Sequence, residues 1–170
     1  MSFQKAHNVS NQLGEVLIST PLIDTTSMGT SVYNYEPSTA VAGKNYRVLE
    51  VGYTVIVVGT NATVDTNFAD VGIQGDTNSF VDACDLPKGS DAPVGTTIST
   101  NSSPSGINCD FRPISTDPTP GAVGYTNIDQ DGVPRLYSGQ LLLARGAGNV
   151  TNGPKVVFFA RLAPIVEYKD

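Results

Sequence analysis

One long alternating run, residues 44–60 (KNYRVLEVGYTVIVVGT), constrains the fold of this chain more than any other feature. Every second position is apolar, namely Leu49, Val51, Tyr53, Val55 and Val57. The positions between them include Glu50, Gly52 and Thr54. Because alternate side chains of a strand point to opposite faces of a sheet, the run predicts a long, half-buried β-strand with the apolar set facing the core.

Further segments carry strand patterns. Residues 69–74 (ADVGIQ) and 106–114 (GINCDFRPI) alternate in the same way, with apolar positions at Ala69, Val71, Ile73, Ile107, Cys109 and Phe111. The apolar runs 139–144 (GQLLLA) and 155–166 (KVVFFARLAPIV) are separated by the loop formers RGAGNVTNGP, which predicts a hairpin with a long tip. Residues 15–23 (EVLISTPLI) suggest another strand, which Pro21 would place at an edge or a bend.

Helical periodicity is not visible along the chain, since apolar residues nowhere recur at spacings of three and four over ten or more positions. Long loops are expected at residues 24–43, 99–106 and 115–134, which are rich in Gly, Pro, Ser and Thr. We therefore expect an all-β fold, a single antiparallel β-sandwich or jelly-roll-like barrel of about eight strands. Residues 1–43 would form an N-terminal arm with a possible edge strand, and residues 44–170 the β-sandwich domain.

The acidic balance of the chain argues against a nucleic-acid partner. Ten Lys and Arg against sixteen Asp and Glu give a net charge of -6 and a pI near 4.6. The apolar runs are shorter than the ~20 residues that cross a bilayer, and residues 1–16 show no apolar signal-peptide core. We expect a soluble protein that has no membrane partner and is not exported by that route.

Cys84 and Cys109 are too few for a disulfide scaffold and lack the spacing of a zinc site. Two interpretations remain open for them. They form one structural disulfide, or they are two buried thiols that act as small hydrophobic residues, which is the favoured interpretation.

Catalytic and cofactor motifs are weak. The single histidine, His7, lies in a polar N-terminal segment, whereas Ser-His or Cys-His catalysis requires a histidine fixed beside a nucleophile. The glycine-containing stretches 38–45 and 145–153 depart from the P-loop and dinucleotide patterns. Asp129 and Asp131 resemble the start of a calcium loop but lack its downstream glutamate, so a β-turn is favoured.

A group of aspartates raises the question of a glycosidase, which needs two carboxylates facing across a cleft: Asp65, Asp70, Asp76, Asp82 and Asp85. Their neighbours are mainly Thr, Asn and Gly, and solvated strand ends explain them better. We expect no catalytic residues, no metal site, no cofactor and no enzymatic activity.

Aromatic and apolar residues outside the strong strand patterns are candidate partner contacts. Tyr33 and Tyr35 lie in a predicted loop and either form a binding surface or close the end of the sandwich. Phe3 and Leu13 lie in the polar N-terminal segment, which either adds a strand to a partner or is a tail before an edge strand. Phe3, Leu13, Tyr33 and Tyr35 are the candidate contacts.

Taken in order, three features resemble a known protein family. They are the long strand at 44–60, the segment GIQGDTNSFVDACDL at 72–86, which fits the pattern GxxGDxxxFVxAxDL, and the final apolar segments at 139–166. This order resembles the small β-sandwich proteins that decorate and cement the heads of tailed bacteriophages. The resemblance covers residues 44–167 and transfers no catalytic residues.

The resemblance implies a structural virion protein that is made in the host cytoplasm and binds the outer surface of the capsid. Its partners would be the major capsid protein and further copies of itself, with a trimer favoured. The alternative function is a carbohydrate-binding or receptor-binding β-sandwich of a viral fibre or tail, which requires an exposed aromatic platform or a metal beside the loops. The third candidate function is a glycan-active enzyme that uses two of the aspartates.

Overall fold

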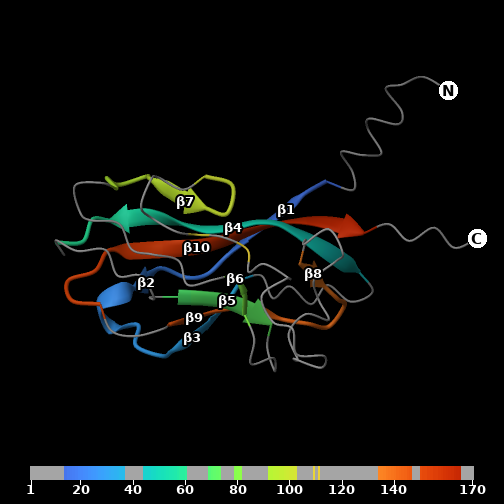
Figure 1. Ribbon diagram of the computed structural model, residues 1–170, viewed down its shortest axis with the longest axis horizontal. Helices are drawn as coiled ribbons and strands as arrows, with labels where there is room; N and C mark the ends of the chain where they lie inside the picture. The colour runs from blue at the N-terminus through green and yellow to red at the C-terminus, as the bar shows by residue number, and fades with distance from the viewer. Residues whose placement is uncertain are drawn as a thin grey trace, which may run out of the picture.

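Two antiparallel β-sheets stack to form the described part of the chain (Figure 1). The computed structural model describes residues 14–36, 44–60, 69–73, 79–81, 92–102, 109, 111, 134–146 and 150–165. Sheet A has the order β1-β10-β4-β7, with β2 also beside β10 and β8 beside β4. Its strands are β1 (Val16–Ser19), β2 (Ile23–Asp24), β4 (Asn45–Val57), β7 (Thr97–Ser99), β8 (Arg135–Leu136) and β10 (Lys155–Ile165).

Sheet B has the order β3-β9-β5-β6. Its strands are β3 (Val32–Asn34), β5 (Ala69–Ile73), β6 (Ser79–Val81) and β9 (Leu142–Gly146). Helix in the described ranges is limited to one 3-10 turn, η1 (Thr25–Ser27). The expected all-β, antiparallel sandwich is confirmed.

Strands β4 and β10 form the centre of sheet A. They pair antiparallel along nearly their whole length, from Asn45 opposite Ile165 to Val57 opposite Lys155. The predicted long strand is therefore confirmed. Its apolar positions Val51, Tyr53 and Val55 are fully buried, as the alternation requires.

Two irregularities in this pairing change which side chains face the core. Glu50 pairs with Arg161 and Val48 with Leu162, so Leu49 is an extra residue in β4. Such a bulge shifts the alternation, because one residue slips out of the ladder. Val48 is consequently buried and Leu49 only half-buried, so the prediction that Leu49 faces the core is wrong.

The second irregularity lies at the other end of β4. Val57 pairs with Lys155 and Val55 with Val156, which leaves Ile56 as the extra residue. Ile56 and Val57 are both exposed. The predicted core position of Val57 is therefore also wrong.

The predicted hairpin between the last two apolar runs is not formed. β9 pairs with β3 and β5 in sheet B, whereas β10 pairs with β1, β2 and β4 in sheet A. The connection between β9 and β10 therefore passes from one sheet to the other. Sheets pack about 10 Å apart, a distance that a connection of this length spans easily.

Residues 14–36 belong to both sheets. β1 is an edge strand of sheet A, β2 follows the bend at Pro21, and β3 is an edge strand of sheet B within the segment predicted to be a loop. Ser19 and Glu36 exchange backbone hydrogen bonds of 3.1 and 2.6 Å, which join the two edges. This part of the predicted N-terminal arm is therefore built into the sandwich.

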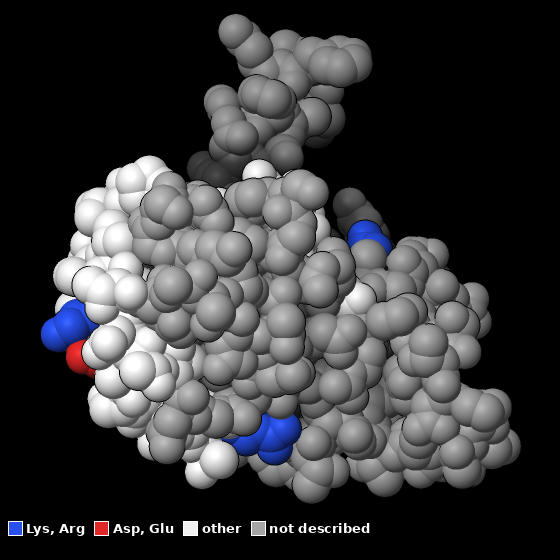
Figure 2. All heavy atoms as spheres, turned by 60° about the vertical axis from the view of Figure 1, so that its left-hand side comes forward, with Lys and Arg blue, Asp and Glu red and all other residues white. Residues whose placement is uncertain are grey.

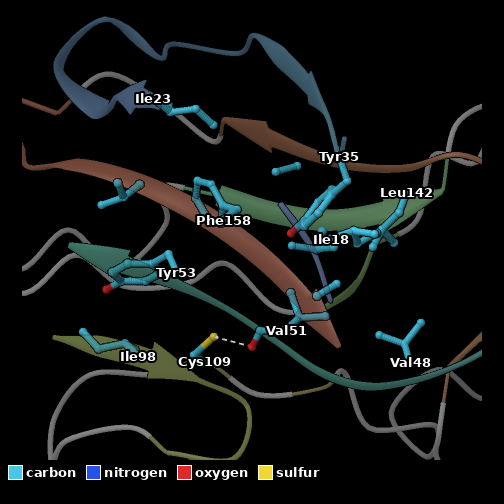
Figure 3. Packing of buried hydrophobic residues seen from close by; sticks show 14 of the residues in the cluster. Ile18, Ile23, Tyr35, Val48, Val51, Tyr53, Ile98, Cys109, Leu142 and Phe158 are labelled. Atoms are coloured by element: carbon cyan, nitrogen blue, oxygen red, sulfur yellow. Dashed lines mark hydrogen bonds between the residues drawn. The ribbon is translucent and has the colours of Figure 1, made fainter. Parts of the chain in front are cut away.

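The core lies between the inner faces of the two sheets (Figure 3). Sheet A supplies Val51, Tyr53 and Phe158, and sheet B supplies Leu142 and Ala144. Full burial of a Val, Leu or Phe side chain stabilises the fold by about 1.5 to 3 kcal/mol.

Candidate functional site

The outer face of sheet A, which points away from sheet B, carries the candidate functional surface. Along β10 the inward residues Val156, Phe158 and Ala160 are buried, and the residues between them are half-buried or exposed. Sheets with one solvated face normally carry polar residues on that face. In β10 the outward positions include Val157 and Phe159 instead.

Exposed apolar side chains gather where β4 ends and β10 begins. The apolar patch consists of Leu22, Ile56, Val57 and Val94, with exposed fractions of 52%, 41%, 46% and 65%. Strand register relates two of them: Lys155 pairs with Val57 on one side and, on the other, with Asp24, two residues after Leu22. Val94 precedes Gly95, whose N–H donates to the Val55 carbonyl.

Figure 2 turns this end of the sandwich, at the left of Figure 1, toward the viewer. The described residues in this view are mostly uncharged, and an acidic and a basic side chain lie together at the margin. The apolar character of this end comes from the exposed side chains of Leu22, Ile56, Val57 and Val94. Exposed apolar side chains that lie near one another mark sites of interaction in proteins.

The bulge at Ile56 is the local cause of the patch. It sets two successive β4 residues, Ile56 and Val57, opposite the single residue Lys155. Both side chains are thereby exposed, although strict alternation would bury one of them.

An ion pair lies within the patch. Lys155 Nζ is 3.3 Å from Asp24 Oδ2, and Asp24 Oδ1 accepts a hydrogen bond of 3.1 Å from the N–H of Thr26, so Asp24 also caps η1. Desolvation raises the pKa of Asp24, but the hydrogen bond from Thr26 and the ammonium of Lys155 together outweigh it and lower the pKa below 3.8. The carboxylate is therefore charged at neutral pH.

The other half of the outer face carries an ionic ladder that runs from the residue before β1 across β10, β4 and β7, and is defined by Glu15, Arg161, Glu50 and Ser99. Arg161 Nη1 lies 3.2 Å from Glu15 Oε2, and Arg161 Nε lies 3.3 Å from Glu50 Oε2. Ser99 Oγ donates to Glu50 Oε1 at 2.5 Å. Because the single positive charge of Arg161 faces two carboxylates, this half is polar and carries a net negative charge.

The predicted contact residues have different positions. Tyr35 is only 1% exposed, and its ring points between Ile18 and Leu142 in the core (Figure 3). Tyr33 lies in β3 and packs partly against the same core. The placement of Tyr33 in a loop is therefore wrong. Tyr35 follows the end of β3 and lies outside the strands, but it is buried and not available to a partner. Phe3 and Leu13 lie outside the described residues.

Most of the chemistry-bearing residues considered from the sequence also lie outside the described ranges: His7, Asp65, Asp76, Asp82, Cys84, Asp85, Asp129 and Asp131. Asp70 lies in β5, and its side chain is not described. In the described part of the chain, no three His, Cys, Asp or Glu residues form a group able to hold a metal ion.

Cys109 is a buried thiol. Its Sγ donates to the carbonyl of Val51 at 3.7 Å, and the side chain belongs to the core cluster (Figure 3). A small apolar role agrees with the favoured interpretation of this cysteine.

Sequence reasoning missed the apolar patch, although a signal was present. The runs VIVV (55–58) and VVFF (156–159) place apolar residues at both parities, which indicates a strand with two apolar faces. Only the strand order shows that their second faces lie on the outside of sheet A.

No protein-family model, curated protein or solved structure matches this chain. Within the described ranges, no helix has the length and apolar character that crossing a membrane requires. Function is therefore inferred from the surface itself. An apolar patch beside an ionic ladder is suited to docking against another macromolecule.

Proposed function

We propose that this protein is a structural binding protein that docks through the apolar patch of sheet A onto the outer surface of a phage capsid, as a decoration or cement protein. The observation that carries the proposal is the exposure of Leu22, Ile56, Val57 and Val94 at one end of one sheet. The capsid as partner follows from the sequence resemblance to phage decoration proteins.

The energetics suit a repeated lattice. Fully burying an exposed Val, Leu or Ile yields about 1.5 to 3 kcal/mol, and these side chains are already partly covered, so each contributes less than that. A patch of four such residues gives a modest affinity for one site once the cost of association is included. Copies joined in a small oligomer would engage several lattice sites together and bind more tightly.

The ionic ladder has a different role in this proposal. Exposed ion pairs add little affinity, typically below about 1 kcal/mol, but they restrict the orientation of docking. We propose that the ladder borders the contact and the apolar patch lies at its centre, in the arrangement that protein interfaces commonly show. The role requires no catalytic residue and no cofactor.

Location is the first test. Phage particles from the producing cells are purified, and the copy number of the chain per particle is measured by quantitative mass spectrometry. A number close to the count of capsid lattice sites supports decoration of the head. A handful of copies would indicate the tail, and absence from intact particles would overturn the proposal.

The second test removes the patch without removing the fold. Ile56→Thr/Val57→Thr exchanges two exposed β-branched residues for another β-branched residue, which preserves strand propensity. Val32→Thr is the matched control, since Val32 is 55% exposed in sheet B. We expect the double variant to bind stripped particles at least about tenfold more weakly, a loss of about 1.4 kcal/mol. Equal binding by all three proteins would exclude the patch as the docking surface.

A further inference from the structure

The turn before β10 contains the only Asn-Gly sequence of the chain, Asn152–Gly153. Asn152 is exposed and has a φ of 51°, in the left-handed region that Asn tolerates better than most residues. The turn immediately precedes Lys155 and hence the apolar patch.

Asn-Gly sequences are chemically labile, because glycine has no side chain to hinder its own amide nitrogen. The Gly153 nitrogen loses its proton and attacks Cγ of Asn152, and the side-chain nitrogen leaves as ammonia. The resulting succinimide is then opened by water at either carbonyl. One product is aspartate, and the other is isoaspartate, in which the backbone runs through the former side chain.

In the folded protein this peptide is held by hydrogen bonds on both sides. Gly153 N–H donates to Thr26 Oγ1 at 3.0 Å, and the carbonyl of Asn152 accepts from Thr60 N–H at 2.9 Å. Two residues further on, the carbonyl of Pro154 accepts from Thr25 Oγ1 at 2.6 Å and from Thr25 N–H at 3.2 Å. The reacting nitrogen is thus engaged with η1.

We propose that Asn152 is a deamidation site, that the fold keeps its deamidation slow, and that the hydrogen bond to the Thr26 hydroxyl controls the rate. Attack on Cγ requires the Gly153 amide to lose its proton and to turn from Thr26, so reaction proceeds from a locally opened turn. Local opening of a native protein is fast compared with such chemistry, and the rate follows the population of the open form.

The product does not fit the closed turn. A Cβ on Gly153 would overlap Thr25 Oγ1 and lie 2.9 Å from Val150 Cγ1, so Gly153 packs closely against η1 and cannot move toward it. Isoaspartate adds one methylene to the backbone here. Its formation therefore releases the turn from η1, next to the Asp24–Lys155 ion pair and the apolar patch.

The test measures deamidation at residue 152 by peptide mass spectrometry after incubation at neutral pH. Thr26→Val removes the hydroxyl from an exposed position, and Thr26→Ser keeps it. Since a hydrogen bond contributes about 0.5 to 1.5 kcal/mol net, we expect Thr26→Val to react roughly two- to tenfold faster and Thr26→Ser to match the wild type. Asn152→Gly, which suits the positive φ, is the control: loss of the deamidation signal in this variant assigns that signal to residue 152.

A comparison without variants completes the test. The wild-type chain in denaturant should deamidate at residue 152 at least about tenfold faster than the folded protein, because the turn is then always open. Equal rates in the folded and unfolded chain would overturn the proposed protection. Equal deamidation rates in the wild type and Thr26→Val would show that the Thr26 hydroxyl does not control the reaction.

Discussion

Tyr53 and Phe158 face each other across β4 and β10 with ring centroids 5.8 Å apart and an interplanar angle of 61°. This edge-to-face arrangement is the favoured geometry of aromatic pairs and adds about 0.5 to 1.5 kcal/mol beyond the buried area. Both rings are fully buried. The pair joins the two longest strands at the centre of the core.

Phe158→Ala should therefore destabilise the protein by about 3 to 5 kcal/mol, through the cavity and the lost ring contact. The melting temperature should fall by roughly 6 to 20 °C. Phe159→Ala is the matched control, since Phe159 follows directly in β10 and is only half-buried on the outer face. Calorimetry showing equal losses for both variants would contradict the assigned inner and outer faces.

Gly52→Ala should weaken the pairing of β4 with β7. An added Cβ would overlap the Ile98 carbonyl and lie 2.6 Å from Ser99 Cα, so the two strands must separate. Overpacking of this kind costs about 1 to 3 kcal/mol. Urea denaturation should show that loss, whereas Thr54→Ala, which removes only a 3.1 Å contact to the Thr97 hydroxyl, should cost less than about 1 kcal/mol.

The ion pair of Asp24 and Lys155 should give a small, pH-dependent contribution. In the folded protein the pKa of Asp24 is lowered below 3.8. The stabilisation by the pair is therefore present above that value and is lost as the pH falls through the folded pKa of Asp24. Because both side chains are well exposed, Asp24→Asn should cost less than about 1 kcal/mol at pH 7. Denaturation curves at decreasing pH should converge for the two proteins, and a difference that persisted in strong acid would contradict this origin.

Cys109 should resist thiol reagents while the protein is folded. In a Cys84→Ser background, a thiol-specific reagent should label residue 109 only at the rate at which the core opens, because the side chain is 1% exposed. Labelling should accelerate across the urea unfolding transition. Rapid labelling under native conditions would contradict the buried position of the thiol.

The N-terminal contacts Phe3 and Leu13 remain predictions. Removing residues 1–13 leaves Glu15 and β1 intact, so the melting temperature should change little. Removing residues 1–19 deletes β1 and its pairing with β10, and it should destabilise sheet A clearly. If the shorter truncation retains full binding to particles, Phe3 and Leu13 are not partner contacts.

The sequence predicted the elements whose signal is local. Period-two runs placed β4 and β5 correctly and an apolar run placed β10, because these patterns depend only on neighbouring residues. The burial of Val48 in place of Leu49 was not predictable from the sequence. The bulge that causes it depends on the register of β4 against a strand about 100 residues away.

The neighbour with which each strand pairs was not predictable from the sequence either. RGAGNVTNGP has the composition of a hairpin tip, yet β9 and β10 belong to different sheets. β3 has only three residues among polar neighbours, too few for a periodic signal. The apolar patch was missed for the same reason, because it arises from strands that are distant in sequence.

The central position of β10 has a consequence for synthesis of the protein. β4 cannot pair with β10 until the roughly 100 residues between Val57 and Lys155 have been translated, which takes about 5 to 20 s at ordinary elongation rates. During that interval the nascent chain exposes the apolar face of β4 without its main partner. Ribosomes that stall before Lys155 should therefore yield chains that bind chaperones and aggregate, so rapid and uninterrupted translation favours a good yield of this protein.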